Sequence, residues 1–242
     1  MAQNIYDRAG FYEGYSRLPR SLFGLDGAAE WPAIRGLLPA LQGKRVADLG
    51  CGFGWFCRWA AGQGAQKVTG YDLSRNMLDR ARRDTVDTSV SYEMADLDTL
   101  VLPEASFDFA YSSLTFHYVQ DFRRLMQVVH NALVPGARFV FTIEHPIYMA
   151  PAHPGWMTDA QGQRTWPVDG YSVEGERRTD WLAKGVLKYH RTMGTTLNTL
   201  IDTGFHIDRV VEWRPTEEQI RQKPELDEEK ERPMILIVAV HR

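Results

Sequence analysis

Cysteine is scarce in this sequence: the 242 residues contain only Cys51 and Cys57. Two thiols are too few for a disulfide-stabilised scaffold, and their spacing lacks the His or Cys companions of a zinc site. His153 and His190 do not have the helical pair spacing, or the nearby carboxylates, that would join them with His145 around a metal. We therefore expect reduced thiols and no metal site.

Long apolar runs are also absent. The longest, at 234–240, is far shorter than the ~20 residues that span a bilayer. Residues 1–15 lack the basic start and apolar core of a secretory leader. We expect a cytoplasmic protein that does not associate with a membrane.

Basic residues are not in excess: the chain contains 28 Lys and Arg residues and 31 Asp and Glu residues, so its net charge is −3. Proteins that grip nucleic acid carry a strong positive surface, so we expect no nucleic-acid partner. Internal repeats, low-complexity tracts and flexible linkers are missing too. This favours a single domain over residues 1–242, present as a monomer or homodimer.

What the chain does contain is an alternation of strand-like and helix-like segments. Short apolar runs predict strands at 44–50, 67–72, 90–95, 107–112, 138–143, 205–213 and 234–240. Apolar residues three or four positions apart predict helices at 31–41, 55–60, 74–81, 121–133 and 195–203. Thr216 and Gln219 form a capping box that opens a short helix, which Pro224 ends. Strands separated by helices predict a parallel sheet with helices on both faces.

Three regions differ from this pattern. Residues 1–43 precede the first strand and predict an N-terminal helical cap. Residues 144–191 are weakly periodic and rich in Pro, Gly, Trp and Tyr, which is typical of an insertion that forms a substrate lid. Residues 225–232 (ELDEEKER) predict a solvated connection. Aromatic residues make up 12% of the chain, with seven tryptophans, and several of these fall in the insertion.

The most informative window is DLGCGFG at 48–54, between the first strand and the first helix. Glycines at such a junction let the backbone turn tightly and approach a ligand at the carboxyl edge of the sheet. Dinucleotide oxidoreductases need G-x-G-x-x-G, but Trp55 occupies the third glycine position here. The spacing G-x-G-x-G, with Asp48 two residues ahead of it, argues against a nicotinamide dehydrogenase.

Two further carboxylates follow the next strands. Asp72 ends the second strand, where it can accept both hydroxyls of a ribose, and Asp96 with Leu97 ends the third, where the pair can bind an adenine amino group. Each is a weak signal alone, because strand-end aspartates often cap helices or turns. In order along one sheet edge, they predict recognition of an adenosine without phosphates.

Together these segments resemble the class I S-adenosylmethionine-dependent methyltransferases. The resemblance is carried by DLGCGFG at 48–54, YD at 71–72, ADL at 95–97, PEASFDFAYSSLTFHYV at 103–119 and LVPGARFVF at 133–141. Ala137 departs from the family, in which many members have a second glycine at this turn. The resemblance implies a Rossmann-like α/β fold whose seven-stranded sheet has the order 3-2-1-4-5-7-6, with the last strand antiparallel.

The resemblance also implies a cofactor site for S-adenosyl-L-methionine, with S-adenosyl-L-homocysteine as product. It places the methionine part at the three glycines of the motif, the ribose at Asp72 and the adenine at Asp96 and Leu97. The expected cofactor-binding residues are Asp48, Gly50, Cys51, Gly52, Gly54, Asp72, Leu73, Asp96, Leu97, Ser112, Ser113 and His117.

Methyl transfer from a sulfonium is an in-line displacement, which alignment and desolvation promote without a covalent enzyme group. A base is needed only for a protonated acceptor, and His145, just past the fifth strand, is the catalytic candidate. The alternative is a turn histidine bonded to the backbone. Aromatic faces suit a planar acceptor and arginine suits a carboxylate, although both types can simply pack. The candidate substrate-binding residues are Tyr15, Arg20, Tyr148, Trp156 and Trp166.

The leading hypothesis is therefore a methyltransferase that acts on a small molecule. An RNA or protein methyltransferase is an alternative, which the acidic balance of charge disfavours. A non-catalytic, regulatory module that binds S-adenosylmethionine is the other alternative. The sequence leaves it open, because catalysis by alignment requires no particular residue.

Overall fold

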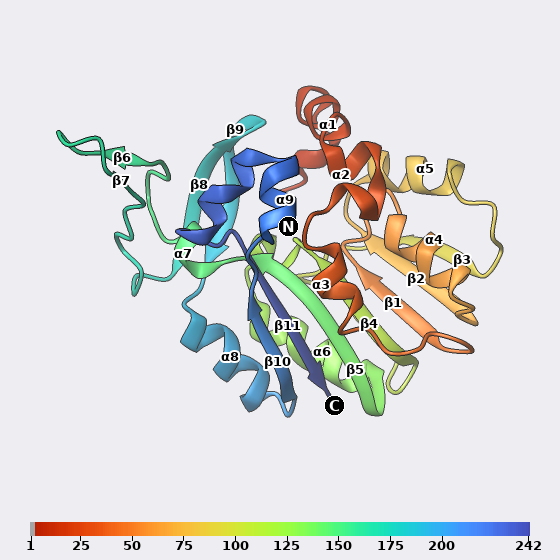
Figure 1. Ribbon diagram of the computed structural model, residues 1–242. Helices are drawn as coiled ribbons and strands as arrows, with labels where there is room; N and C mark the ends of the chain where they lie inside the picture. Colours follow the sequence, from red (N-terminus) through yellow and green to blue (C-terminus); the bar gives the residue numbers. More distant parts are fainter. Residues whose placement is uncertain (1–2) are drawn as a thin grey trace.

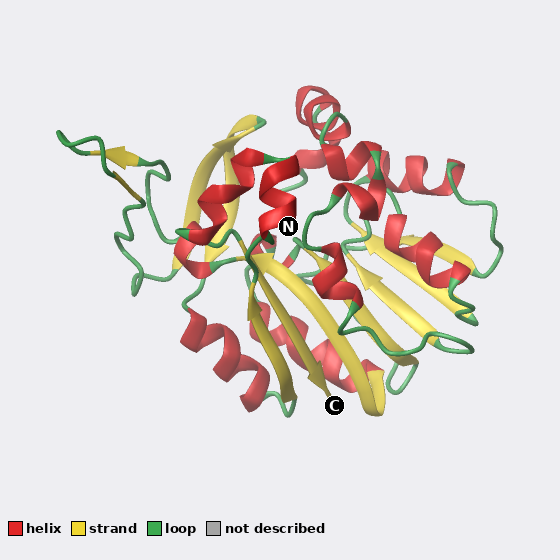
Figure 2. Cartoon of the chain, in the orientation of Figure 1, coloured by secondary structure: helices red, strands yellow, loops and turns green. Residues whose placement is uncertain are grey.

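The computed structural model describes residues 3–242, so residues 1 and 2 of the expected cap lie outside the described residues. A seven-stranded sheet forms the centre of the molecule (Figures 1 and 2). Its spatial order is β10-β11-β5-β4-β1-β2-β3. The strands are β1 (Arg45–Leu49), β2 (Lys67–Asp72), β3 (Val90–Met94), β4 (Phe107–Ser113), β5 (Leu133–Glu144), β10 (His206–Glu212) and β11 (Ile235–His241).

The direction of the strands follows the expected pattern. Strands β1 to β5 run parallel, whereas β11 is inserted between β5 and β10 and is antiparallel to both. The predicted order 3-2-1-4-5-7-6 with an antiparallel last strand is therefore confirmed. Because five neighbouring strands are parallel, their carboxyl ends meet at one edge, where ligands bind in such sheets.

Helices cover both faces of the sheet, as predicted (Figure 1). One apolar cluster joins the sheet to the inward residues of two helices, and a second cluster joins the other face to three helices. The first pair is α6 (Phe122–Ala132) and α8 (Met193–Asp202); the second set is α3 (Trp31–Arg35), α4 (Trp55–Gly62) and α5 (Arg75–Arg83). Among residues 3–242, no helix combines the length and apolarity needed to cross a membrane.

Local signals set most of the element boundaries. The Thr216–Gln219 capping box is present and opens α9 (Glu217–Gln222), and Pro224 follows its end. Two boundaries differ from the predicted ones by more than two residues. Strand β5 begins at Leu133, five residues early, because Leu133 pairs with Phe107 before the register shifts. Helix α3 ends at Arg35 instead of continuing to residue 41.

The N-terminal residues form short helices above the carboxyl edge of the sheet (Figure 1). A carboxylate fastens their start to the beginning of α5. Asp7 accepts hydrogen bonds from the Ser74 hydroxyl at 2.5 Å and from the Asn76 amide at 3.0 Å. The elements are η1 (Ile5–Asp7), α1 (Ala9–Ser16), α2 (Pro19–Leu22) and η2 (Gly24–Gly27), followed by α3.

The segment after β5 contains a helix and two antiparallel hairpins. The β6–β7 hairpin projects from the body, whereas β8–β9 stands beside the N-terminal helices (Figure 1). Val186 of β9 packs against Ile5 and Phe11 in a small apolar cluster. The sequence did not predict this hairpin. The elements are α7 (Pro146–Met149), β6 (Met157–Thr158), β7 (Arg164–Thr165), β8 (Gly175–Trp181) and β9 (Ala183–His190).

The prediction of a solvated connection at 225–232 is wrong for two of these residues. Most of it forms η4 (Pro224–Lys230), and Glu229 and Arg232 are buried. They are ion-paired at 3.1 Å, and Glu229 also accepts the Met234 amide at 2.6 Å. Both charges can be buried because each is paired with the other.

Replacing Phe139 tests the central packing. Its ring is fully buried in β5 and stacks on Phe141 with a centroid separation of 5.0 Å. Phe139→Ala should lower the free energy of unfolding in urea by ~3–5 kcal/mol, because it leaves a cavity that the sheet cannot close. The matched control is Phe23→Ala, at a ring that is 67% exposed. Equal losses in the two variants would contradict this account of the core.

Candidate functional site

A cavity of about 320 Å³ runs along the carboxyl edge of the sheet. It follows the strands in their spatial order, from β3 across β2, β1 and β4 to β5. Each strand end contributes one lining residue or more; in that order they include Asp96, Asp72, Gly50, Ser113 and Glu144. The carboxylates predicted from separate parts of the sequence thus share one cavity.

Aromatic side chains from outside the sheet cover this cavity. Tyr6 and Tyr15 come from the N-terminal helices, and Tyr148 and Trp181 come from the segment after β5. The Tyr6 and Tyr15 rings meet edge to face at 5.2 Å, and Tyr15 meets Trp181 in the same way at 6.3 Å. The Tyr6 hydroxyl lies 3.2 Å from that of Tyr118. These contacts link the two covering segments above the sheet edge.

Asp72 connects the end of β2 to the glycine turn. Its Oδ2 accepts the Gly52 amide and its Oδ1 accepts the Ser74 amide, both at 2.9 Å. Burial raises the pKa of the carboxyl, while the amide bonds oppose this shift. A carboxylate has about four lone-pair sites, so each oxygen can still accept another donor. This is the arrangement that a pair of neighbouring hydroxyls requires.

The glycines of the turn have different tasks. Gly52 has φ 51°, and a Cβ added there would meet nothing within 4 Å, so its backbone faces open space beside the cavity. Gly54 also has positive φ, at 72°, but an added Cβ would lie 2.1 Å from the Tyr92 hydroxyl. Gly52 leaves room for a ligand, whereas Gly54 allows α4 to begin close to β3.

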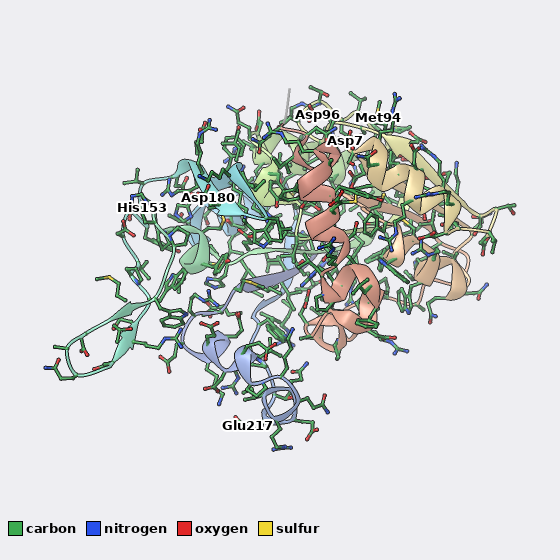
Figure 3. The ribbon with its side chains drawn as sticks, turned by 90° about the horizontal axis from the view of Figure 1, so that it is seen from above. Asp7, Met94, Asp96, His153, Asp180 and Glu217 are labelled. Atoms are coloured by element: carbon green, nitrogen blue, oxygen red, sulfur yellow. The ribbon has the colours of Figure 1, made fainter. Side chains whose placement is uncertain are left out.

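Asp96 lies at the far end of the cavity, after β3. Its Oδ1 accepts the Asp98 amide at 3.0 Å, and the Asp98 carboxylate in turn accepts the amides of Gln120 and Asp121. Leu97 beside it is buried. Figure 3 shows Asp96 on the side of the molecule where Met94 of β3 lies, far from His153 in the segment after β5. This end of the cavity therefore combines a carboxylate with an apolar wall.

Asp48 lies beneath the glycine turn and is buried. Burial raises the pKa of its carboxyl to about 7, although the Cys57 thiol donates a hydrogen bond to Oδ2 at 3.2 Å. Burial also raises the pKa of the Cys51 thiol to about 11, so this sulfur stays protonated at neutral pH. At low pH the Asp48 carboxyl and the Cys51 thiol are therefore both uncharged. As the pH rises and Asp48 ionises, the floor of the cavity near the turn gains a negative charge.

The β4–β5 end of the cavity contains a second polar group. His117 and Glu144 both line it, and the Glu144 amide donates to His117 Nδ1 at 3.4 Å. Lys188 donates to Glu144 Oε1 at 2.6 Å. Leu114, with φ 51°, also lies here, its backbone held by Thr142. A non-glycine residue in this conformation is strained, and it is fixed here by bonds to β5.

Most of the predicted site residues come together. Thirteen of them line the cavity: Asp48, Gly50, Cys51, Gly52, Asp72, Leu73, Asp96, Leu97, Ser113, His117, Tyr15, Arg20 and Tyr148. Arg20 is ion-paired with the buried Glu30 at 3.1 Å, so its charge is already matched. The remaining five residues, Gly54, Ser112, His145, Trp156 and Trp166, are not among the residues that line it.

The structure places His145, the candidate general base, outside the cavity lining. Its Nδ1 accepts the Ile147 amide at 3.1 Å, and its Nε2 faces Glu212 of β10 at 2.9 Å. Burial lowers its pKa. Both ring nitrogens are engaged away from the cavity, which matches the alternative of a turn histidine. Ser112 is also buried, and its hydroxyl donates to the Leu49 carbonyl at 2.6 Å.

Trp156 and Trp166 pack against the C-terminal region instead of the cavity. The Trp156 indole donates to Glu228, and the Trp166 indole donates to the Ile147 carbonyl at 3.1 Å. The Arg232 guanidinium lies 5.7 Å from the Trp156 ring centroid and 4.6 Å from that of Trp166. Both rings pack against this region in the structure, and a substrate contact by either one stays a prediction.

The sequence analysis missed several lining residues, among them Phe53, Leu114, Tyr118 and Trp181. Phe53 lies within the glycine motif and Tyr118 within the segment after β4, so their nearness in sequence to predicted residues could have indicated both. No such signal indicated Trp181, because its position depends on the hairpin β8–β9. Glu144, next to His145 in the sequence, was not predicted as a site residue.

The donors and the open space fit S-adenosylmethionine. Asp72 retains lone pairs for a ribose diol, Asp96 and Leu97 offer a carboxylate and an apolar wall for adenine, and Gly52 leaves space beside the turn. Among residues 3–242, no group of three His, Cys, Asp or Glu side chains is placed to hold a metal ion.

Comparison with known proteins shows the family to which this chain belongs. A family model described as a methyltransferase domain matches residues 47–141. An S-adenosylmethionine-dependent methyltransferase from Mesorhizobium loti, solved as a crystal structure, is 63% identical, with a TM-score of 0.87 over 90% of this chain and 100% of that chain. This chain belongs to the class I S-adenosylmethionine-dependent methyltransferases.

Two further relatives are similar to this methyltransferase. An uncharacterised protein from Haemophilus influenzae is 33% identical over 217 residues, which cover 86% of this chain and 85% of the relative. A malonyl-[acyl-carrier protein] O-methyltransferase from Erwinia billingiae is 33% identical over 102 residues, or 42% of this chain and 39% of that protein. The second match covers less than half of either chain.

Replacing Asp72 tests the ribose end of the site. Asp72→Asn should weaken binding of S-adenosylhomocysteine in isothermal titration by about 10-fold or more, because charge-assisted hydrogen bonds are lost. The matched control is Asp79→Asn on the exposed side of α5, where the carboxylate pairs with Arg82. Unchanged affinity in Asp72→Asn would remove this residue from the site.

The raised pKa of Asp48 predicts a pH-dependent stability. The Asp48 carboxyl has a pKa of about 7 in the folded chain, compared with its ordinary value of 3.8. A carboxyl whose pKa is raised by folding stabilises the folded chain below pH 4, and this stabilisation is lost as the pH rises to 7. Asp48→Asn cannot ionise, so between pH 5 and pH 8 it should gain roughly 1–3 kcal/mol in urea unfolding relative to the wild type. A difference that stays constant with pH would refute this.

Proposed function

We propose that this methyltransferase transfers the methyl group of S-adenosylmethionine to a small-molecule acceptor bound at the β4–β5 end of the cavity. The observation that carries the proposal is the cavity itself: it runs along five strand ends and is covered by both the N-terminal helices and the segment after β5. A covered cavity of about 320 Å³ suits small ligands, which pockets of ~300–1,000 Å³ usually bind.

The proposed cofactor orientation follows the sheet edge. S-adenosylmethionine supplies a methyl group on a positively charged sulfur. Asp96 and Leu97 would hold the adenine, Asp72 the ribose, and Gly50 and Gly52 the methionine part. Adenosine at the β2–β3 end then leaves the β4–β5 end, beyond Ser113, for the acceptor.

The residues around the acceptor end would align it and exclude water. Tyr6, Tyr118, Tyr148 and Trp181 present aromatic surface to the cavity. Such rings bind a planar or partly aromatic molecule. Alignment and desolvation account for much of the rate of an in-line displacement. In this proposal residues 1–43 and 144–191 are a cap and a lid of one domain.

The balance of charge supports a small acceptor over a nucleic acid. The net charge of −3 offers no general attraction to nucleic acid.

Methyl-labelled S-adenosylmethionine tests the proposal. The wild type is incubated with a cell extract that has been separated into small molecules and macromolecules, and Asp72→Asn is the impaired control. We expect label to enter the small-molecule fraction. Label in RNA or protein would contradict the proposed acceptor class, and tight cofactor binding without methyl consumption in either fraction would indicate a regulatory module.

A further inference from the structure

Glu144 has one carboxylate oxygen without a hydrogen-bond partner. It is the last residue of β5, and its side chain is 14% exposed at the acceptor end of the cavity. Oε1 accepts the ammonium of Lys188 at 2.6 Å, but Oε2 is buried and accepts no hydrogen bond from residues 3–242. A buried acceptor atom left unpaired is costly. A donor on a bound molecule would satisfy it.

The surroundings of Glu144 determine which donor fits. Lys188 is 3% exposed, and its ammonium lies 5.5 Å from the Trp181 ring and 6.0 Å from that of Tyr118. The rings and the carboxylate already share this buried cation. A second cation would be repelled by Lys188, so the site favours a neutral molecule.

His117 adds a neutral wall to the group. Because its Nδ1 accepts the Glu144 amide, its proton resides on Nε2, which lies 3.9 Å from Glu144 Oε1. Burial lowers the pKa of His117 to about 4, so the ring is uncharged at neutral pH. Glu144 is therefore the proton-accepting group that faces the acceptor end, and Lys188 compensates its charge.

We infer that Glu144 binds the methyl acceptor through Oε2, and that the acceptor is a neutral molecule that presents an O–H or N–H group. The inference rests on the proposed function, whose acceptor it narrows to a chemical class. Lys188 is a positioning residue, because it holds Oε1 and leaves Oε2 as the carboxylate oxygen without a partner.

Methyl transfer to an O–H or N–H group releases a proton, and in this inference Glu144 accepts it. A lone pair of the acceptor oxygen or nitrogen forms the new bond to the methyl carbon. The carbon–sulfur bond breaks, and its electron pair remains on sulfur, which becomes neutral. The proton of the acceptor passes to Glu144, which becomes a carboxylic acid and later releases that proton to water.

Binding of two simple probes tests the inference without requiring turnover. Phenol is neutral at pH 7 and carries the O–H group, whereas anisole has the same ring with the donor capped by a methyl group. Ligand-observed NMR titrations use the wild type saturated with S-adenosylhomocysteine. We expect phenol to bind about 10-fold more tightly than anisole, as for a hydrogen bond to a charged group.

Two glutamate variants locate the effect. Glu144→Gln keeps the side-chain size but removes the charge, and it should reduce the preference for phenol to about 2-fold or less. Glu176→Gln on β8 is the matched control, because this carboxylate is 49% exposed and pairs with Arg178. If Glu144→Gln does not fold, the wild type can still overturn the inference, because equal binding of phenol and anisole would contradict it.

The results separate this inference from the proposed function. Normal S-adenosylhomocysteine binding with equal or undetectable binding of phenol and anisole would overturn the inference and leave methyl transfer standing. A phenol preference that persists in Glu144→Gln would also overturn it. Failure to bind S-adenosylhomocysteine, by contrast, would count against the proposed function itself.

Discussion

The site depends on the hydrogen bonds of one carboxylate. Asp72 ends β2 and accepts the amides of Gly52 and Ser74, so it joins the turn after β1 to the start of α5. Asp7 caps the same helix and so brings the N-terminal helices over the cavity. The glycine turn, the start of α5 and part of the cover are thus held by two aspartates that are 65 residues apart in the sequence, Asp7 and Asp72.

The sheet and the grouping of Asp72 and Asp96 along one cavity could be predicted because their signals are local. Apolar runs define β1 to β5, and the glycine motif and the strand-end carboxylates follow them directly. Parallel strands end at one edge, so Asp72 and Asp96 had to lie along the same cavity. The early start of β5 was less visible, because Pro135 and Gly136 usually interrupt a strand.

The acceptor end was harder to predict because it depends on side-chain direction and on distant segments. Glu144 and His145 are adjacent, yet Glu144 lines the cavity and His145 bonds to β10. Neighbouring residues in extended chain point to opposite sides, so a shift of one residue exchanges the two roles. Trp156 and Trp166 illustrate the second difficulty, since their partner Arg232 comes from a segment that reads as solvated.

The central claim is that adenosine occupies the β2–β3 end of the cavity and methyl transfer occurs at the β4–β5 end. A crystal structure with bound S-adenosylhomocysteine tests it most directly. The account predicts ribose hydroxyls on Asp72 and the sulfur between the glycine turn and Ser113, with Glu144 Oε2 facing the space beyond it. Adenine at the β4–β5 end, or a sulfur directed away from Glu144, would contradict it.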